Sequence, residues 1–312
     1  MARILLILIL CTCLSQLQAQ DTTFNFFVPS VDFNSTRVYS LAGSYAVIYT
    51  GALVILNEFW YKSYPKSSFH FFDDSKEWLQ MDKVGHIYTA YFEGLWSVRA
   101  LEWSGLGQNK SIWYGGLTGS VLQSTIEILD GYSAKWGASW SDLAANSLGS
   151  AIVIAEEKLW GEQRILMKFS YTSQRHPEGL GLRAGDLFGT GTFETIIKDY
   201  NGQTYWLSVN PASFLNDDTK FPSWLNVAIG YGATGIYGGF ENIWEVNGMT
   251  IDRTDVARTR QYYLSLDVDL TKFKTNKPFL NTLLGIINII KIPAPALRYD
   301  SGVGFSVRAF YF

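Results

Sequence analysis

The chain has 312 residues, of which 47% are apolar and 17% are charged, and its formal net charge is −3. Soluble domains have about 25% charged residues, so this chain has enough apolar side chains for a large core, for contact with a membrane, or for both. The near-neutral charge and the lack of a basic stripe exclude the usual kind of nucleic-acid-binding surface.

Residues 1–19 have the pattern of a secretory signal peptide, with a positive residue, an apolar run and a cleavage site that ends at Ala19. Cleavage there would make Gln20 the first residue of the mature chain. The two cysteines, Cys11 and Cys13, both lie inside this segment, and neither follows the small residues usual at a lipoprotein cleavage site. We therefore predict an exported protein without cysteine and without a lipid anchor. Acylation of Cys11 or Cys13 is the alternative.

Four apolar segments follow and are predicted to be helices. Residues 41–57 contain no charged residue and suit a buried helix, at the lower limit of the length that crosses a membrane. Asp74 or Ser75 is in position to cap the next helix, and Ser139 to cap the last. The next two helices are predicted to end near residues 103 and 130, and the last to run through residues 143–155 and become charged at residues 156–158. Because charged residues interrupt these apolar runs, we interpret them as a packed or partly membrane-embedded bundle.

Strand-like alternation begins near residue 165. Five strands are predicted, over residues 165–171, 204–209, 224–230, 261–270 and 304–312. Two short helices are predicted over residues 193–200 and 279–290, and Pro293 and Pro295 end the second. We therefore predict an α+β fold, with a helical bundle over residues 20–165 and a mixed region with a small antiparallel β-sheet over residues 166–312.

The final segment, residues 304–312, alternates in polarity and ends in Phe312. This pattern resembles the last strand of an outer-membrane β-barrel. The five predicted strands are fewer than the roughly eight of the smallest such barrels. A last strand in a small sheet is therefore the favoured interpretation.

Gly230, Gly232 and Gly235 have the spacing of a dinucleotide-binding loop, and Asp255 lies twenty residues beyond the last of them. Such a loop must open a helix whose first amides bind the pyrophosphate. Residues 236–240 are glycine-rich and predict no helix, so we interpret the motif as a glycine-rich strand or bulged loop and predict no nucleotide. The sequence also has no serine nucleophile elbow, no H-E-x-x-H and no P-loop.

The strongest functional signal is a set of polar residues at helical spacing on otherwise apolar helices. Asp82, His86 and Glu93 fall within about 40° of one another around one predicted helix. Buried ionisable groups are unfavourable unless they face each other or a ligand, so we expect these residues to converge with others of their kind. The same pattern occurs on the next two helices, in Gln123, Glu127 and Asp130 and then in Asp142 and Asn146.

These residues divide into two groups of candidates. The candidate catalytic residues are Asp82, His86, Glu127 and Asp142, and the candidate binding residues are Glu93, Gln123, Asp130 and Asn146. One imidazole with two or three carboxylates can bind a divalent metal or form an acid–base pair. The other interpretation is a buried polar network that fixes how the helices pack. The sequence leaves these interpretations open.

Three motifs carry a resemblance to a known family. They are Asp82-Lys83-Val84-Gly85-His86, Glu127-Ile128-Leu129-Asp130-Gly131, and Ser139-Trp140-Ser141-Asp142 followed by Asn146 and Gly149. With residues 198–207 and 291–297, the chain resembles the DUF2279 family of predicted periplasmic proteins, which includes YfiM-like lipoproteins. It is more loosely similar to VanZ-like membrane proteins, which share the D-K-x-x-H and D-x-x-x-N-x-x-G layout. The resemblance implies a Gram-negative envelope location and no particular activity.

The sequence thus leaves two functions to be tested. The first is an exported, membrane-associated and non-enzymatic envelope protein, located in the periplasm or at the outer membrane, with membrane or envelope lipid as its partner. The alternative is a metal-dependent or acid–base enzyme or binder that acts on an envelope lipid or glycan through Asp82, His86, Glu127 and Asp142.

Overall fold

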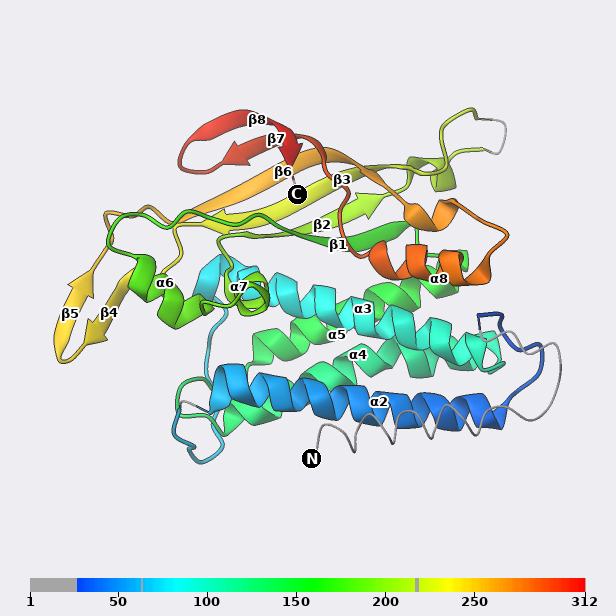
Figure 1. Cartoon of the computed structure of the whole chain (residues 1–312), viewed down its shortest axis with the longest axis horizontal. Coiled ribbons are helices and arrows are strands. Elements are labelled where there is room, and N and C mark those ends of the chain that lie inside the picture. Colours follow the sequence, from blue (N-terminus) through cyan, green and yellow to red (C-terminus); the bar gives the residue numbers. More distant parts are fainter. Residues whose placement is uncertain (1–26, 63, 217–218, 312) are drawn as a thin grey trace.

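The computed structural model describes residues 27–62, 64–216 and 219–311 and confirms the predicted α+β fold (Figure 1). A layer of long helices comes first in the chain, and a six-stranded antiparallel sheet follows it. The helical layer lies along one side of the sheet, with α3 nearest to the strands (Figure 1). The predicted signal peptide, with both cysteines, lies outside the described residues.

In the part of the chain that the structure describes, the helical layer consists of four long helices. They are α2 (Ser35–Leu56), which continues into the π-helical turn η1 (Asn57–Tyr61), α3 (Met81–Trp103), α4 (Gln108–Gly131) and α5 (Trp140–Trp160). Tyr45 and Tyr49 of α2 donate or share hydrogen bonds with Ser97 of α3 and the carbonyl of Leu122 in α4. The predicted cap of α5 is confirmed, because Ser139 Oγ accepts a hydrogen bond from the amide of Asp142.

Small residues allow α3, α4 and α5 to approach closely. A Cβ atom placed on Gly119 of α4 would lie 2.0 Å from the carbonyl oxygen of Ala90 in α3. One placed on Gly149 of α5 would lie 2.3 Å from the carbonyl oxygen of Ile87. Gly115 and Gly119 are spaced four apart, the small-xxx-small pattern by which membrane helices pack backbone to backbone. The bundle therefore depends on the absence of side chains at these positions.

The prediction that residues 41–57 form a buried helix is wrong as to burial. Within α2, all of which is described, Arg37 is the only buried residue. Val47, Ile48 and Val54 are 60%, 71% and 58% exposed. An uncharged helix of this kind suits a protein core or lipid equally well in composition, and the described residues leave most of its apolar surface uncovered.

The start of α3 also differs from the prediction. Neither Asp74 nor Ser75 caps the helix, because α3 begins only at Met81, after the 3₁₀ turn η2 (Glu77–Gln80). Trp78, Leu79 and Gln80 have φ angles of 50°, 52° and 62°, a left-handed conformation that is rare for residues other than glycine.

Contacts from the β-rich region hold this left-handed turn in place. The amide of Trp78 donates a 2.8 Å hydrogen bond to the carbonyl of Gly239, and the hydroxyl of Tyr231 donates to the carbonyl of Leu79. Arg260 donates a 2.6 Å hydrogen bond to the side chain of Gln80. Each partner lies more than 150 residues further along the chain, so the turn is fixed by tertiary contacts.

The sheet has the strand order β1-β2-β3-β6-β7-β8, and each neighbouring pair is antiparallel. Its strands are β1 (Ile165–Tyr171), β2 (Gln203–Val209), β3 (Leu225–Thr234), β6 (Thr259–Val268), β7 (Ala294–Asp300) and β8 (Gly304–Tyr311), and a separate hairpin contains β4 (Ile243–Val246) and β5 (Met249–Asp252). The described helices between them are α6 (Gly181–Phe188), α7 (Thr192–Lys198), η3 (Pro211–Phe214), η4 (Leu270–Lys272) and α8 (Pro278–Ile287).

The five predicted strands are all present, but the prediction missed β4, β5 and β7. Strand β7 was missed because Pro293 and Pro295 read as helix terminators, whereas they stand at the beginning of a strand. The glycine motif that begins at Gly230 lies at the end of β3 and in the turn after it. No helix opens there, in agreement with the predicted strand or loop.

The sheet has an unusual distribution of polarity. One face of the sheet has a row of aliphatic side chains that crosses five strands in register: Leu207, Ile229, Leu264, Leu297 and Val307. All of them are at least 42% exposed. The opposite face contains the ion pair between Lys168 and Asp267, whose side chains are fully buried and 2.8 Å apart. One face of the sheet is thus apolar and largely exposed, and the other has a buried ion pair.

Candidate functional site

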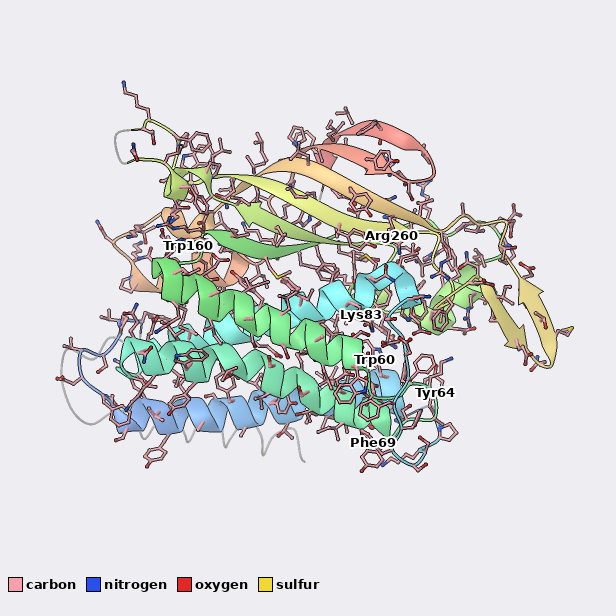
Figure 2. The ribbon with its side chains drawn as sticks, turned by 180° about the vertical axis from the view of Figure 1, so that it is seen from behind. Trp60, Tyr64, Phe69, Lys83, Trp160 and Arg260 are labelled. Carbon is pink, nitrogen blue, oxygen red and sulfur yellow. The ribbon has the colours of Figure 1, made fainter. Side chains whose placement is uncertain are left out.

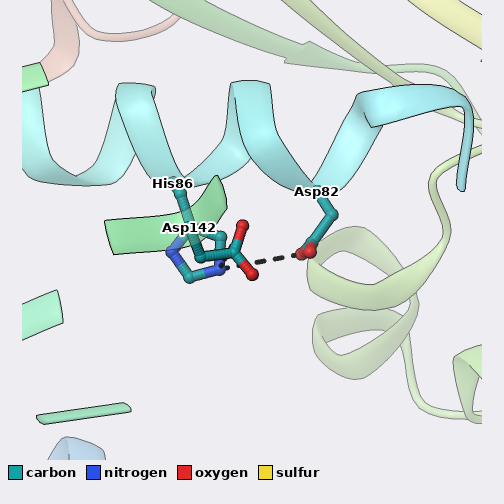
Figure 3. A group of neighbouring side chains, drawn as sticks. All are labelled: Asp82, His86 and Asp142. Carbon is teal, nitrogen blue, oxygen red and sulfur yellow. Dashed lines mark ion pairs between the residues drawn. The ribbon is translucent and has the colours of Figure 1, made fainter. Parts of the chain in front are cut away.

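The four candidate catalytic residues come together at one end of the helical bundle. Figure 3 shows three of them, Asp82, His86 and Asp142. Asp82 and His86 are in the first two turns of α3, Glu127 is in the last turns of α4, and Asp142 is in the first turn of α5. The connections between these helices, residues 104–107 and 132–139, are short. Short connections make neighbouring helices antiparallel, so the start of α3 meets the end of α4 and the start of α5.

His86 is at the centre of the group. Its Nε2 atom lies 3.8 Å from Asp82 Oδ1, 3.8 Å from Asp142 Oδ1 and 3.9 Å from Glu127 Oε1. These distances are too long for hydrogen bonds. On the other side of the ring, Nδ1 lies 3.0 Å from the side-chain oxygen of Asn146. His86 therefore has one close partner and faces three carboxylates across a gap.

Lys83 contacts the same carboxylates from the other side. Its ammonium group lies 2.6 Å from Asp74 Oδ2, 2.7 Å from Asp142 Oδ1 and 3.0 Å from Asp82 Oδ2. The side chain is only 10% exposed. The hydroxyl of Tyr200 adds a 2.9 Å hydrogen bond to Asp82 Oδ1. This buried ammonium offsets part of the negative charge of the cluster.

Glu127 is the most enclosed carboxylate of the cluster, with a residue exposure of 2%. Its Oε2 atom accepts a 2.9 Å hydrogen bond from the amide of Ser139. Its Oε1 atom, which faces His86, is buried and has no hydrogen-bond partner among the described residues. A buried carboxylate oxygen without a partner is unfavourable, so this atom marks an incompletely satisfied site.

The structure separates three of the candidate binding residues from this centre. Glu93 accepts a 3.0 Å hydrogen bond from Gln123, and the two form a pair of their own between α3 and α4. Asp130 accepts a 2.7 Å hydrogen bond from the hydroxyl of Tyr61. The fourth candidate, Asn146, is the one that contacts His86 directly.

Sequence reasoning missed Asp74, Lys83 and Tyr200 as members of the cluster. Lys83 had a usable signal, because a lysine between an aspartate and a histidine on an apolar helix needs a partner. Asp74 was assigned to a helix cap, and its carboxylate instead contacts Lys83, Ser139 and Ser141. Tyr200 had no signal, because its contact with Asp82 spans 118 positions.

The charges of the cluster shift the pKa values of its members. Burial alone would lower the pKa of His86, but the three surrounding carboxylates outweigh burial and raise it above its ordinary value. Burial and the charge of Asp82 raise the pKa of Asp142. Burial would also raise the pKa of Asp74, but hydrogen bonds from Lys83 and Ser139 outweigh it and lower that pKa. The cluster therefore combines carboxylates of different proton affinity.

A hollow of about 360 Å³ lies beside the cluster. It is lined by Phe71, Phe72, Asp73, Ser139, Trp140 and Ser141. Ser139 belongs to both the hollow and the cluster, because its hydroxyl donates a 2.5 Å hydrogen bond to Asp74. Trp140 stacks on Phe71 at a ring distance of 4.7 Å and forms an aromatic wall. The cluster is thus one residue away from the protein surface.

Three side chains of the cluster, those of Asp82, His86 and Asp142, are of the types that bind metal ions. One ligand atom each of Asp82, His86 and Asp142 lies within 4.8 Å of the other two. Carboxylate oxygen and imidazole nitrogen are common ligands of divalent metals such as Zn²⁺ and Mn²⁺.

Comparison with known proteins finds a family match in the segment that contains the polar cluster. No curated protein and no solved structure matches the chain. Residues 69–157, which contain α3, α4 and most of α5, match the model of a family described as a predicted periplasmic lipoprotein. This segment also contains every candidate catalytic and binding residue. Over residues 69–157 the chain is thus a match to the DUF2279 family, as its sequence motifs implied.

Proposed function

We propose that this chain is a membrane-associated envelope protein in which α2 and the outward side of α4 contact lipid. The observation that carries the proposal is the reversed polarity of α4. Its large apolar side chains point outward, with Val121 and Tyr114 both 65% exposed and Trp113 46% exposed. Its buried positions instead hold glycines and polar residues such as Gln123 and Glu127. A helix in water has the opposite arrangement.

Helix α2 supports the same proposal. The continuous helical segment Ser35–Tyr61 has 27 residues and a mean hydropathy of 1.5, and is long and apolar enough to cross a membrane by length and composition. None of its most apolar part is buried against the rest of the described chain. Exposed apolar patches of this extent are typical of surfaces that meet a membrane or a partner.

Aromatic side chains gather at both ends of the bundle. Trp60, Tyr64 and Phe69 lie at the end that also holds Lys83, and Trp160 lies at the opposite end (Figure 2). Tryptophan and tyrosine concentrate where a membrane meets water. Their positions favour an orientation in which the apolar middle of the bundle contacts lipid and the polar cluster is close to the lipid–water boundary.

Membrane association predicts that the wild-type protein floats with liposomes and stays in the membrane fraction after a high-salt wash. Replacing Leu117 and Val121 with lysine should release a large share of it, because charged side chains at lipid-facing positions are unfavourable. Leu182→Lys is the matched control, since this leucine is 88% exposed on α6. Recovery of the wild-type protein in the soluble periplasmic fraction without detergent would contradict the proposal.

A second candidate function is metal-dependent or acid–base action of the cluster on an envelope lipid or glycan. The unpartnered Glu127 Oε1 favours it, because a purely structural network would satisfy this atom. A strain that carries Glu127→Gln should then show the same change in envelope lipid or glycan composition as a deletion strain, at an unchanged protein level. An envelope composition equal to that of the wild type would argue against this function.

We also propose that the chain itself carries no lipid, although the matching family is described as a lipoprotein. The two cysteines of the sequence are Cys11 and Cys13, and neither has a lipoprotein cleavage context. Intact mass spectrometry of the exported protein should give a chain that begins at Gln20. A chain that begins at an acylated Cys11 or Cys13 would disprove the proposal.

A further inference from the structure

The charges of the buried cluster do not balance. Four carboxylates, those of Asp74, Asp82, Glu127 and Asp142, surround one ammonium group. Lys83 forms ion pairs with three of them, Asp74, Asp82 and Asp142. Buried charges without compensation are strongly unfavourable. A proton on His86 would supply one further positive charge, and a cation bound between His86 and the carboxylates would offset the remaining negative charge.

The protonation of the His86 ring decides which of its nitrogen atoms can bind a metal ion. With the amide oxygen of Asn146 facing the ring, the 3.0 Å contact corresponds to the tautomer that carries its proton on His86 Nδ1. In a neutral ring, Nε2 then presents its lone pair to three carboxylate oxygens. In metal sites a second residue commonly fixes the histidine in this way, by accepting a hydrogen bond from the nitrogen that does not bind the metal.

The distances agree with an ion in the gap. Ligands about 2.0–2.2 Å from a metal lie no more than about 4.4 Å from one another. The Nε2 atom of His86 is 3.8 Å, 3.8 Å and 3.9 Å from its three carboxylate oxygens. One ligand atom each of Asp82, His86 and Asp142 lies within 4.8 Å of the other two, and Glu127 stands just outside this set, in reach of the imidazole. Glu127 Oε1, buried and without a hydrogen-bond partner, points into the same space. This atom is evidence for a ligand that is independent of the acidic cluster itself.

We propose that His86 Nε2 and the carboxylates of Asp82, Glu127 and Asp142 bind one divalent transition-metal ion. One nitrogen and three oxygen ligands suit Zn²⁺ or Mn²⁺ better than Ca²⁺, which prefers oxygen ligands alone. Lys83 then holds the outer oxygen of Asp82, Oδ2, while Tyr200 donates to Oδ1, the oxygen that faces His86, and Asn146 contacts the other side of the imidazole. The inference deepens the second candidate function and does not depend on contact with lipid.

Zn²⁺ binding to the full exported protein in detergent tests the proposal. After removal of metal with a chelator, the wild type should take up one Zn²⁺ per chain, measured by equilibrium dialysis and elemental analysis, and its melting temperature should rise. Glu127→Gln keeps the size of the side chain but removes the ligand charge. This variant and His86→Ala should weaken Zn²⁺ binding at least about 100-fold, the upper end of what loss of a supporting residue causes.

Glu156→Gln is the matched control, because Glu156 is also buried but binds the amides of Arg164 and Ile165 away from the cluster. It should bind Zn²⁺ as the wild type does. Co²⁺ in place of Zn²⁺ should give visible absorption bands that Glu127→Gln alters and Glu156→Gln leaves unchanged. If His86→Ala does not fold, Glu127→Gln alone decides the outcome.

Two results would overturn the metal site. One is a wild-type protein that binds no Zn²⁺ or Mn²⁺, and the other is equal binding by the wild type and Glu127→Gln. Either result can occur while the Glu127→Gln strain still shows the altered envelope. The metal proposal would then be wrong, and the second candidate function would stand without it.

Discussion

Replacing Lys83 with methionine should lower the free energy of unfolding by about 3–5 kcal/mol, the usual effect of removing one partner from a buried ion pair. Methionine keeps most of the volume of the side chain but leaves Asp74, Asp82 and Asp142 without their common partner. The loss should be measured as a lower midpoint of chemical unfolding in detergent, at neutral pH.

Lys62→Met provides the control for this experiment. Lys62 also forms an ion pair, with Glu58 at 2.7 Å, but its side chain is 64% exposed. Exposed pairs contribute about 0–1 kcal/mol, so this variant should unfold almost as the wild type does. Equal unfolding midpoints for Lys83→Met and Lys62→Met would show that the cluster is not held together by Lys83.

Replacing Gly119 with alanine should destabilise the bundle by about 1–3 kcal/mol, the range for overpacking in a tight core. The added methyl group would lie 2.0 Å from the backbone oxygen of Ala90. A backbone atom cannot rotate away, so α3 and α4 would have to separate. The change in free energy can be measured by thermal or chemical unfolding of the purified protein.

Gly51→Ala is the matched control for Gly119→Ala. Gly51 lies inside α2, and a Cβ atom there would meet no other atom within 4 Å. Alanine favours the helix by up to about 1 kcal/mol over glycine, so this variant should be as stable as the wild type or more stable. If both alanine variants were more stable than the wild type, α3 and α4 would not be in close backbone contact at Gly119.

The convergence of the polar residues could be predicted because helical periodicity is a local property. Asp82 and His86 are one turn apart, and the short connections between helices bring Glu127 and Asp142 to the same end of the bundle. Lys83 and Asp74 were not recognised as partners because an ion pair between them depends on how the loop before α3 folds back. Periodicity indicates which residues share a face, and gives no information on a loop.

Other features could not be predicted because they are set by distant parts of the chain or by the surroundings. The uncharged residues of α2 are compatible with a core or with lipid, and composition does not distinguish the two. Strand β7 was hidden by Pro293 and Pro295, which also end helices. Proline is tolerated at the beginning of a strand, so only its pairing with β6 and β8 identifies this segment as part of the sheet.

The left-handed turn before α3 has a consequence for the modularity of the protein. The family match covers residues 69–157, yet the conformation of residues 78–80 is held by Gly239, Tyr231 and Arg260, which lie outside that segment. The matched segment, residues 69–157, is therefore smaller than the part of the chain that has to fold together to form the turn. Grafted onto another protein, the matched segment would lose the contacts that hold the turn immediately before Asp82 and His86. Substitutions at Arg260 or Tyr231, both in the sheet, can in turn displace these side chains.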